Sequence, residues 1–189
     1  MMQITASPIE TYSVVIHPPD EVINAVAALK QLLEQKIGWY HSVHSLAHIT
    51  FNVFKSRVSA ISLWEAYLSD FSGNHSPIPL YFDRAECFSN GSFVLLANEQ
   101  TNLLLKEIMR DFNNNRPKGA VKKSQRPHLT IARKLNAEQM AIAAELIADI
   151  NIHFTLDQLV LRKLNLAKGQ YDTIATFPFT CQRSTLQSC

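Results

Sequence analysis

The sequence predicts an α+β fold of two similar lobes, each an antiparallel sheet with helices on its outer face, around a central groove. Short β-branched, apolar runs alternate with amphipathic helical segments, and the order strand, helix, strand occurs twice. The chain has 189 residues, of which 47% are hydrophobic and 18% charged, so it can bury a core and is not disordered. We expect one bilobal domain over residues 1–180 and a polar tail over 181–189.

The first half of the chain predicts a strand, a helix, a strand and a helix. Apolar residues recur every three or four positions after Asp20, the expected N-cap, and the run stops at Gly38. The strands are expected at residues 11–17 and 48–54, and the second helix at about 56–71.

The second half begins with a predicted hairpin. Its turn is marked by Asn90-Gly91, because this dipeptide supplies the positive φ angles that a tight turn requires. The expected elements are strands at 80–87 and 92–97, a helix at 100–113, a basic loop at 116–126, a strand at 128–135, a helix at 136–150 and strands near 152–166 and 172–179.

The two halves repeat with an offset of 80 residues. Val14 in the first predicted strand aligns with Val94, and His48 in the next strand aligns with His128. A constant offset across two different elements predicts two lobes related by an approximate two-fold axis.

Positive charge is concentrated in one stretch. The net charge is only +2, yet seven cations and no acid lie between Asp111 and Glu138. Such a run is either a solvated surface or a patch that attracts phosphate.

Nothing in the sequence predicts export or membrane insertion. No apolar run approaches the roughly 20 residues that span a bilayer, and the first residues have no leader pattern. The three cysteines lack a short paired spacing, so neither a disulfide framework nor a zinc knuckle is indicated. We therefore expect a cytoplasmic monomer without membrane contact.

Two predicted strands begin with the pattern His-x-Thr. Side chains alternate along a strand, so His48 and Thr50 share one face. By the same reasoning, His128 and Thr130 share a face of the other strand. A two-fold axis would bring two imidazoles and two hydroxyls into one groove. In-line hydrolysis of a phosphodiester needs an acid and a base on opposite sides of phosphorus, and histidine serves both roles near neutral pH.

A third match to this pattern shows that the pattern alone is not sufficient. His153 and Thr155 also fit, but they follow His128 by only 25 residues and break the 80-residue offset. We interpret His153 as an ordinary strand histidine. For any single histidine, a hydrogen-bonded place on a half-buried strand is the commoner role, whereas the symmetric pair favours catalysis.

The paired motifs HITF at 48–51 and HLTI at 128–131 resemble those of the two-histidine (2H) phosphoesterase superfamily, especially its branch of 2'-5' RNA ligases and RNA 2',3'-cyclic phosphodiesterases. The resemblance extends over residues 11 to 180. Members are typically metal-free and open 2',3'-cyclic phosphates of RNA ends or nucleotides, and some join or cleave 2'-5' linkages in tRNA. The resemblance implies a cyclic phosphodiesterase with no metal and no cofactor.

The resemblance also implies roles for individual residues. His48 and His128 become the acid and the base, and Thr50 and Thr130 bind the phosphate. It favours His128 as the group that activates water and His48 as the group that protonates the leaving oxygen. The first motif departs from the family in one place, because Ala47 stands where members often have proline.

Other residues are candidates for binding substrate. Arg133 completes HLTIAR, a continuation often seen in the ligase branch, but on a strand it would point away from His128 unless the strand bends or ends there. The remaining candidates are Lys122, Lys123 and Arg126 of the basic loop, and Tyr171 before the last strand.

Neighbouring residues have simpler interpretations. His41, His44 and His48 have metal-ligand spacing only if they lie on one helix, and no carboxylate or cysteine is close to them, so we expect no metal. Trp39 and Tyr40 either stack on a nucleobase or, as we favour, pack a helix end.

Two other functions stay open at this point. One is ligation of tRNA halves through 2'-5' linkages in the same groove, and the other is a non-catalytic module that binds RNA ends. The substrate itself is also open among tRNA, an oligonucleotide, a mononucleotide and an ADP-ribose cyclic phosphate.

Overall fold

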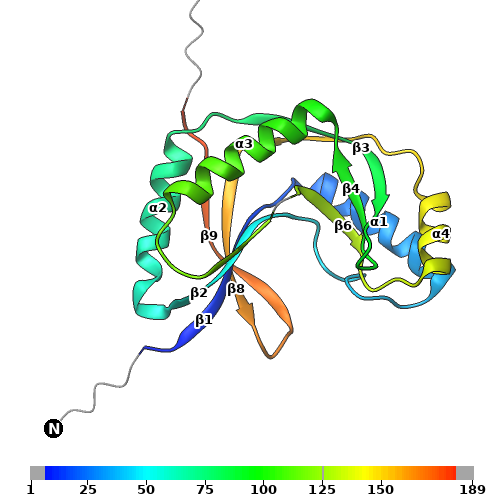
Figure 1. Cartoon of the computed structure of the whole chain (residues 1–189), viewed down its shortest axis with the longest axis horizontal. Coiled ribbons are helices and arrows are strands. Elements are labelled where there is room, and N and C mark those ends of the chain that lie inside the picture. Colours follow the sequence, from blue (N-terminus) through cyan, green and yellow to red (C-terminus); the bar gives the residue numbers. More distant parts are fainter. Residues whose placement is uncertain (1–6, 125, 182–189) are drawn as a thin grey trace, which may run out of the picture.

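Two antiparallel sheets form the framework of the computed structural model, which describes residues 7–124 and 126–181 (Figure 1). The first sheet has the order β5 (Val121–Lys123), β2 (Ile49–Arg57), β1 (Ile9–Ile16), β8 (Gln158–Asn165) and β9 (Gln170–Pro178). The second sheet has the order β6 (His128–Ala132), β4 (Phe93–Ala97), β3 (Ile78–Cys87) and β7 (Ile152–Leu156). The predicted α+β fold with two antiparallel lobes is confirmed.

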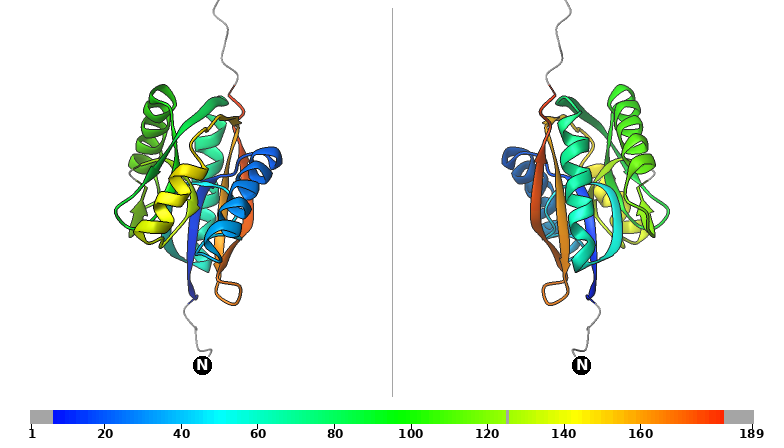
Figure 2. Two further views of the ribbon diagram at one scale, coloured as in Figure 1. Left: turned by 90° about the vertical axis from the view of Figure 1, so that its right-hand side faces the viewer. Right: turned by 90° about the vertical axis from the view of Figure 1, so that its left-hand side faces the viewer.

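One helix crosses from the sheet that it follows to the other sheet. The chain has α1 (Asp20–Ile37), a 3-10 turn η1 (Val58–Ala60), α2 (Ile61–Gly73), α3 (Glu99–Asn115) and α4 (Ala137–Leu146). Helix α1 follows β1 of the first sheet but packs on β6 and β7 of the second, beside α4. Figure 2 shows α1 and α4 at one end of the molecule and α2 at the opposite end. None of the helices in the described residues is long and apolar enough to cross a bilayer.

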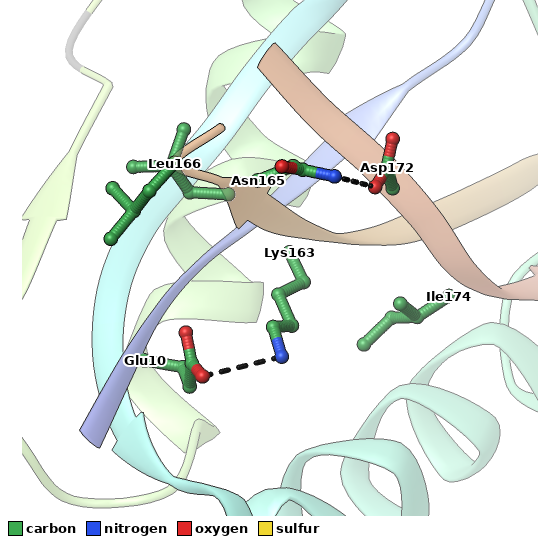
Figure 3. A pocket seen from close by; sticks show the side chains of 7 residues that line it. Glu10, Lys163, Asn165, Leu166, Asp172 and Ile174 are labelled. Carbon is green, nitrogen blue, oxygen red and sulfur yellow. Dashed lines mark hydrogen bonds and ion pairs between the residues drawn. The ribbon is translucent and has the colours of Figure 1, made fainter. Parts of the chain in front are cut away.

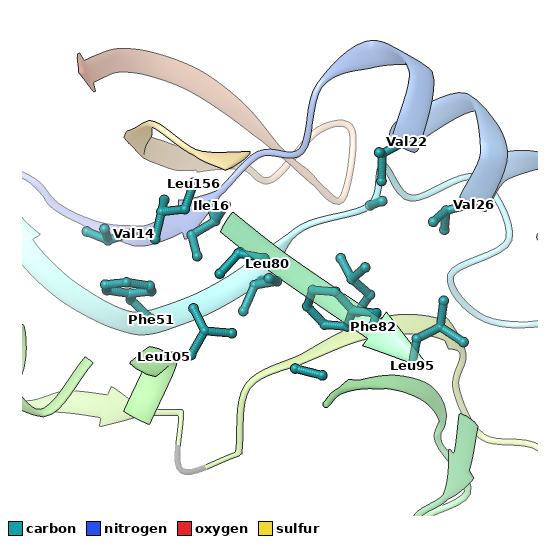
Figure 4. Packing of buried hydrophobic residues seen from close by; sticks show 14 of the residues in the cluster. Val14, Ile16, Val22, Val26, Phe51, Leu80, Phe82, Leu95, Leu105 and Leu156 are labelled. Atoms are coloured by element: carbon teal, nitrogen blue, oxygen red, sulfur yellow. The ribbon is translucent and has the colours of Figure 1, made fainter. Parts of the chain in front are cut away.

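Helix α3 spans both lobes, since it contacts β3 and β4 of its own sheet and its last turns reach the first lobe. It follows β4 of the second sheet, and the ring of its Phe112 lies 5.4 Å from that of Phe51 on β2. Phe112 also contacts Tyr67 and Phe71 of α2. The crossing of α1 and the reach of α3 explain why a single apolar cluster holds both lobes together, from Val14 of β1 to Phe82 of β3 (Figure 4).

Each sheet has a helix face and an opposite face, which we call the inner face. On β1, the side chains of Tyr12, Val14 and Ile16 belong to the apolar cluster on the helix face. Alternation along the strand therefore places Ser13 and Val15 on the inner face. The inner faces carry the predicted site.

The motif strands of the two lobes contain matching β-bulges. On β2 the register jumps at Phe51, between the pairs Val15–Thr50 and Val14–Asn52. On β6 it jumps 80 positions later, at Ile131, between the pairs Val94–Thr130 and Phe93–Ala132. A bulge of this kind re-aims the side chains next to it. Both threonines directly precede one.

The pairing of the motif strands with their neighbours corrects the predicted alignment of the repeat. Thr50 and Thr130 are 80 apart, as predicted, but the residue that pairs with Thr130 is Val94 and the residue that pairs with Thr50 is Val15. The partner strands are therefore offset by 79, and Val14 does not correspond to Val94. Sequence comparison cannot detect a one-residue slip between two apolar runs, because both register choices align Val with an aliphatic residue.

Several predicted elements have different bounds in the structure. The predicted basic loop is not a loop throughout, because β5 lies within it and pairs with β2. The predicted strand near 152–166 is two strands, β7 and β8, which belong to different sheets. Pro19, not Asp20, is the N-cap of α1, and Asp20 is its first helical residue. Helix α4 ends at Leu146, and its start is fixed by the capping box of Asn136 with Gln139. Of the predicted tail, residues 182–189 lie outside the described residues.

The predicted hairpin turn depends on Gly91. This residue has φ +78, and a Cβ there would lie 2.8 Å from the carbonyl oxygen of Leu135. We expect Gly91→Ala to lower the free energy of unfolding by about 3 kcal/mol, because backbone strain adds to a clash with backbone atoms that cannot rotate away. The control Gly169→Ala has a similar φ of +64 with no atom within 4 Å, so it should cost only about 1 kcal/mol. The free energies of unfolding are measured with denaturant. Equal losses in the two variants would show that the backbone moves and relieves the clash at Gly91.

Candidate active site

The two motif histidines are held in the same way. Nδ1 of His48 donates a hydrogen bond of 2.8 Å to the carbonyl oxygen of Leu46. Nδ1 of His128 donates one of 2.7 Å to the carbonyl oxygen of Arg126. A carbonyl only accepts, so Nδ1 carries the hydrogen in each ring and Nε2 presents its lone pair. Among the described residues, neither Nε2 atom has a hydrogen-bond partner.

The motif threonines lie beside these rings on the inner faces. Both side chains are half-buried. Thr50 pairs with the inner-face residue Val15, and Thr130 pairs with its counterpart Val94. Within the described part of the chain, the structure gives neither hydroxyl a side-chain hydrogen bond. Each lobe therefore offers one imidazole acceptor and one hydroxyl donor.

Burial and neighbouring cations keep both imidazoles neutral. Burial lowers the pKa of His48 to about 3, with a further contribution from the positive charges of Arg162 and Arg133. Burial also lowers the pKa of His128, and the charges of Arg133 and Arg126 act in the same direction. Arg133 thus lies within electrostatic reach of both rings, which connects the two halves of the site.

Sequence reasoning did not identify Arg162 on β8. Its side chain is only 6% exposed, its Nε donates to Oγ of Ser13 at 3.2 Å, and its guanidinium lies 5.1 Å from the ring centre of Tyr171. Among the described residues it has no carboxylate partner, and burial lowers its pKa to about 10. A buried cation without a counter-ion is costly, so this position is suited to an anionic ligand.

His17 was also missed. It directly follows β1, its charge acts on His48, and its Nε2 is buried without a hydrogen-bond partner in the described structure. Burial lowers its pKa, as does the charge of Arg162. The alternation Ser13, Val15, His17 was the available sequence signal, but no motif singled it out.

The two lobes differ at equivalent positions beside the histidines. Arg162 pairs with Ser13 on β1, whereas the backbone N–H of Phe88 donates to the carbonyl oxygen of Ser92, which directly precedes β4 and follows Ser13 by 79 residues. The ring of Phe88 lies 5.5 Å from that of His128, edge to face. A cation thus flanks the first histidine and an aromatic ring flanks the second, which makes the site asymmetric.

The predicted binding residues have different surroundings. Beyond the bulge at Ile131, Ala132 lies on the helix face, so the next residue, Arg133, follows on the inner face. Its backbone pairs with His41, to whose carbonyl oxygen its N–H donates. Tyr171 is half-buried against Arg162. Arg126 forms an ion pair with Glu86, with an N–O distance of 2.7 Å, so its charge is compensated.

The two lysines of β5 point to opposite faces. Lys122 pairs with Val53, which pairs with inner-face Ser13, so Lys122 lies on the inner face. Lys123 pairs with Asn52, whose amide hydrogen-bonds Asn113 of α3, so Lys123 lies on the helix face. The sequence predicts both lysines in one loop, and only the pairing of β5 with β2 shows that they lie on opposite faces of the sheet.

The remaining histidine and aromatic candidates have local contacts. His153 is exposed and stacks on Tyr81. Trp39 is 63% exposed and contacts His41, whereas Tyr40 is buried and donates to the carbonyl oxygen of Lys30. In the described ranges, no group of three or more His, Cys, Asp or Glu side chains is arranged to hold a metal ion.

A hollow of about 440 Å³ lies away from the histidines, near the β8–β9 turn (Figure 3). Its charged side chains are already satisfied: Lys163 pairs with Glu10 at 3.3 Å, and Asp172 accepts from Asn165 at 2.7 Å. This hollow therefore offers a ligand no unpaired group.

Two antiparallel sheets, each with a His-x-Thr motif on the corresponding strand, define the class of two-histidine phosphoesterases. The family model for the 2'-5' RNA ligase superfamily matches residues 18–167, and the chain belongs to this superfamily. No protein of curated function matches the chain in sequence.

Solved structures share the fold. TT0787 of Thermus thermophilus is 18% identical, with a TM-score of 0.64 over 90% of this chain and 98% of that one. E. coli LigT complexed with 3'-AMP is 14% identical, with a TM-score of 0.61 over 92% of this chain and all of LigT. Kluyveromyces marxianus Usb1 is 11% identical, with a TM-score of 0.50 over 89% of this chain and 98% of Usb1.

Proposed function

We propose that the protein is a metal-independent phosphoesterase that opens 2',3'-cyclic phosphates of RNA ends or nucleotides. The observation that carries this proposal is the matched pair of imidazoles, each with Nδ1 bound to a backbone carbonyl and Nε2 presenting a lone pair. Membership of the 2'-5' RNA ligase superfamily supports it.

In the proposed reaction, a water oxygen attacks phosphorus and the bond from phosphorus to one ribose oxygen breaks. One imidazole accepts the water proton at Nε2, and the other donates a proton to the departing oxygen, which leaves a monoester. Following the family resemblance, His128 is the base and His48 the acid. The bound phosphate is an anion, so it offsets the charge of Arg162 and raises the pKa of His48 in the complex.

Three further groups stabilise the phosphate in this proposal. Thr50 and Thr130 donate their hydroxyl hydrogens to the non-bridging oxygens. Arg162 supplies a fixed positive charge, which is worth more in its buried position than on the surface. We assign Arg133, Lys122 and Tyr171 to the remainder of the nucleotide, because each lies at or near the inner face.

Ligation of RNA ends through 2'-5' linkages is a second candidate, favoured by the description of the matching family. A ribose hydroxyl then replaces water as the nucleophile, so the same acid and base serve both reactions. Joined product from defined tRNA halves would distinguish ligation from hydrolysis.

The test is turnover of 2',3'-cyclic mononucleotides and of RNA that ends in a cyclic phosphate, with and without EDTA. We expect monoester product from at least one substrate, at equal rates in both conditions. An absence of product from every substrate, together with RNA binding, would instead indicate a non-catalytic binding module.

The same assay yields a pH profile with a defined sign. Activity requires one imidazole neutral and the other protonated, and burial lowers the pKa of both from 6.5 in the free protein. We therefore expect kcat/KM to have its maximum below pH 6.5 and to fall on either side. The maximum of kcat should lie at a higher pH than that of kcat/KM, because the bound anion raises the pKa values of both histidines. A kcat/KM maximum above pH 7 would contradict these pKa shifts.

A further inference from the structure

A second hollow, which we call the α3–β5 hollow, lies on the helix face beside the edge strand. It has a volume of about 220 Å³, and its lining residues come from α3, from β5 and from the segment before the second motif: Lys106, Met109, Arg110, Asn113, Asn114, Lys123, Ser124 and Pro127. None of these residues belongs to the proposed catalytic groove.

The lining of this hollow is cationic. Lys106 and Arg110 are one helical turn apart on α3, and Lys123 approaches from β5. No acidic side chain lines it, and none of the three cations forms an ion pair among the described residues. Like charges four residues apart oppose each other on a helix. Amines and a guanidinium beside amide and hydroxyl donors match the oxygens of a phosphate group.

The hollow is close in the fold to the second motif. Pro127, at its rim, directly precedes His128, which faces the inner side of the sheet. Strand β5 is at the edge of the first sheet, and its Lys122 and Lys123 lie on opposite faces. Positive charge thus continues from the inner face, over this edge, into the hollow. Because no further strand pairs with that edge in the described structure, a ligand chain can pass over it.

We propose that the α3–β5 hollow binds a backbone phosphate of an RNA strand whose cyclic phosphate end occupies the catalytic groove. This inference rests on the proposed function and specifies its substrate class, a polynucleotide in preference to a mononucleotide. The site reads no base, because its donors address phosphate oxygens.

The test is the double variant Lys106→Gln/Arg110→Gln. Its kcat/KM on a short RNA with a 2',3'-cyclic phosphate end should fall about 10-fold, and the slope of log(kcat/KM) against log salt should fall by about 0.7, since each phosphate that a protein neutralises on a single strand contributes about 0.7. Turnover of a 2',3'-cyclic mononucleotide should change less than about twofold, because a mononucleotide does not reach the hollow.

The matched control Lys36→Gln/Lys168→Gln removes the same charge from exposed positions on α1 and in the β8–β9 turn and should leave the turnover of both substrates unaffected. The inference is overturned if the control lowers RNA turnover equally, if the test variant affects both substrates equally, or if it affects neither. If the unmodified protein turns over neither substrate, the proposed function fails. RNA binding at the hollow is then tested separately by fluorescence anisotropy with the same RNA. A loss of affinity in the test variant but not in the control variant supports the site, and equal affinities of the two variants and the unmodified protein overturn it.

Discussion

Replacing either His48 or His128 by alanine should lower kcat/KM on a 2',3'-cyclic phosphate at least about 100-fold. Each substitution removes a group that accepts or donates a proton in the transition state, a contribution of roughly 10² to 10⁴ in rate. His48 directly precedes β2 and His128 begins β6, each with Nδ1 bound to a backbone carbonyl, so alanine removes Nε2 without disturbing the paired strand. Initial rates at saturating and limiting substrate measure the loss.

The chain contains a matched control in its third His-x-Thr sequence. His153→Ala removes an exposed histidine that stacks on Tyr81 of the neighbouring strand, and activity should change less than about twofold. Full activity of His48→Ala or His128→Ala, or an equal loss in His153→Ala, would refute the assignment of the site.

A p-nitrophenyl phosphodiester separates the roles of the two histidines. This leaving group departs without protonation, so loss of the acid matters less for it than for a ribose leaving group. We expect His48→Ala to lose less activity on the p-nitrophenyl ester than on the cyclic phosphate, and His128→Ala to lose equally on both. The opposite pattern would show that His128 is the acid and His48 the base.

Arg162→Met should lower kcat/KM about 100-fold while leaving the protein as stable as before. Methionine fills much of the same volume, and the lost charge is one that the described structure leaves without a carboxylate partner. Loss of one fixed donor to a developing anionic charge costs roughly 10² to 10³ in rate. A merely structural arginine would show the reverse, with a large fall in unfolding temperature and little effect on the chemistry.

Two further measurements test the role of Arg162. NMR titration should show the pKa of His48 rising in Arg162→Met, since the positive charge of Arg162 lowers it in the unmodified protein. Lys163→Met is the control, because Lys163 alternates with Arg162 on β8 and pairs with Glu10 away from the histidines. An unchanged pKa of His48 in Arg162→Met would place this arginine out of reach of the catalytic ring.

Much of the fold was predictable because its signals are local. The period of apolar residues located α1, and Asn90-Gly91 located the hairpin between β3 and β4. The two His-x-Thr motifs predicted both strands of the site and the superfamily, which the family model confirms over residues 18–167. Their assignment as catalytic residues stays a prediction that the variants above will test.

The errors arose where the answer depends on pairing between distant segments. The predicted correspondence of Val14 with Val94 was one residue off because the connection between the paired strands is one residue shorter in the first lobe, with 35 positions from Val15 to Thr50 and 36 from Val94 to Thr130. Likewise, nothing local in the basic stretch predicted that β5 would pair with β2 and turn Lys122 and Lys123 to opposite faces.

The sequence by itself determined that two imidazoles and two hydroxyls lie on corresponding strands of a duplicated α+β fold, because side-chain alternation and repetition are properties of the chain alone. Only the tertiary structure decided which charges surround them. Arg162 is 114 residues from His48 in the chain, and strands β8 and β2 come together solely because both pair with β1. Burial in that arrangement, and not residue type, produces the unpaired cation and the lowered histidine pKa values on which the proposed chemistry depends.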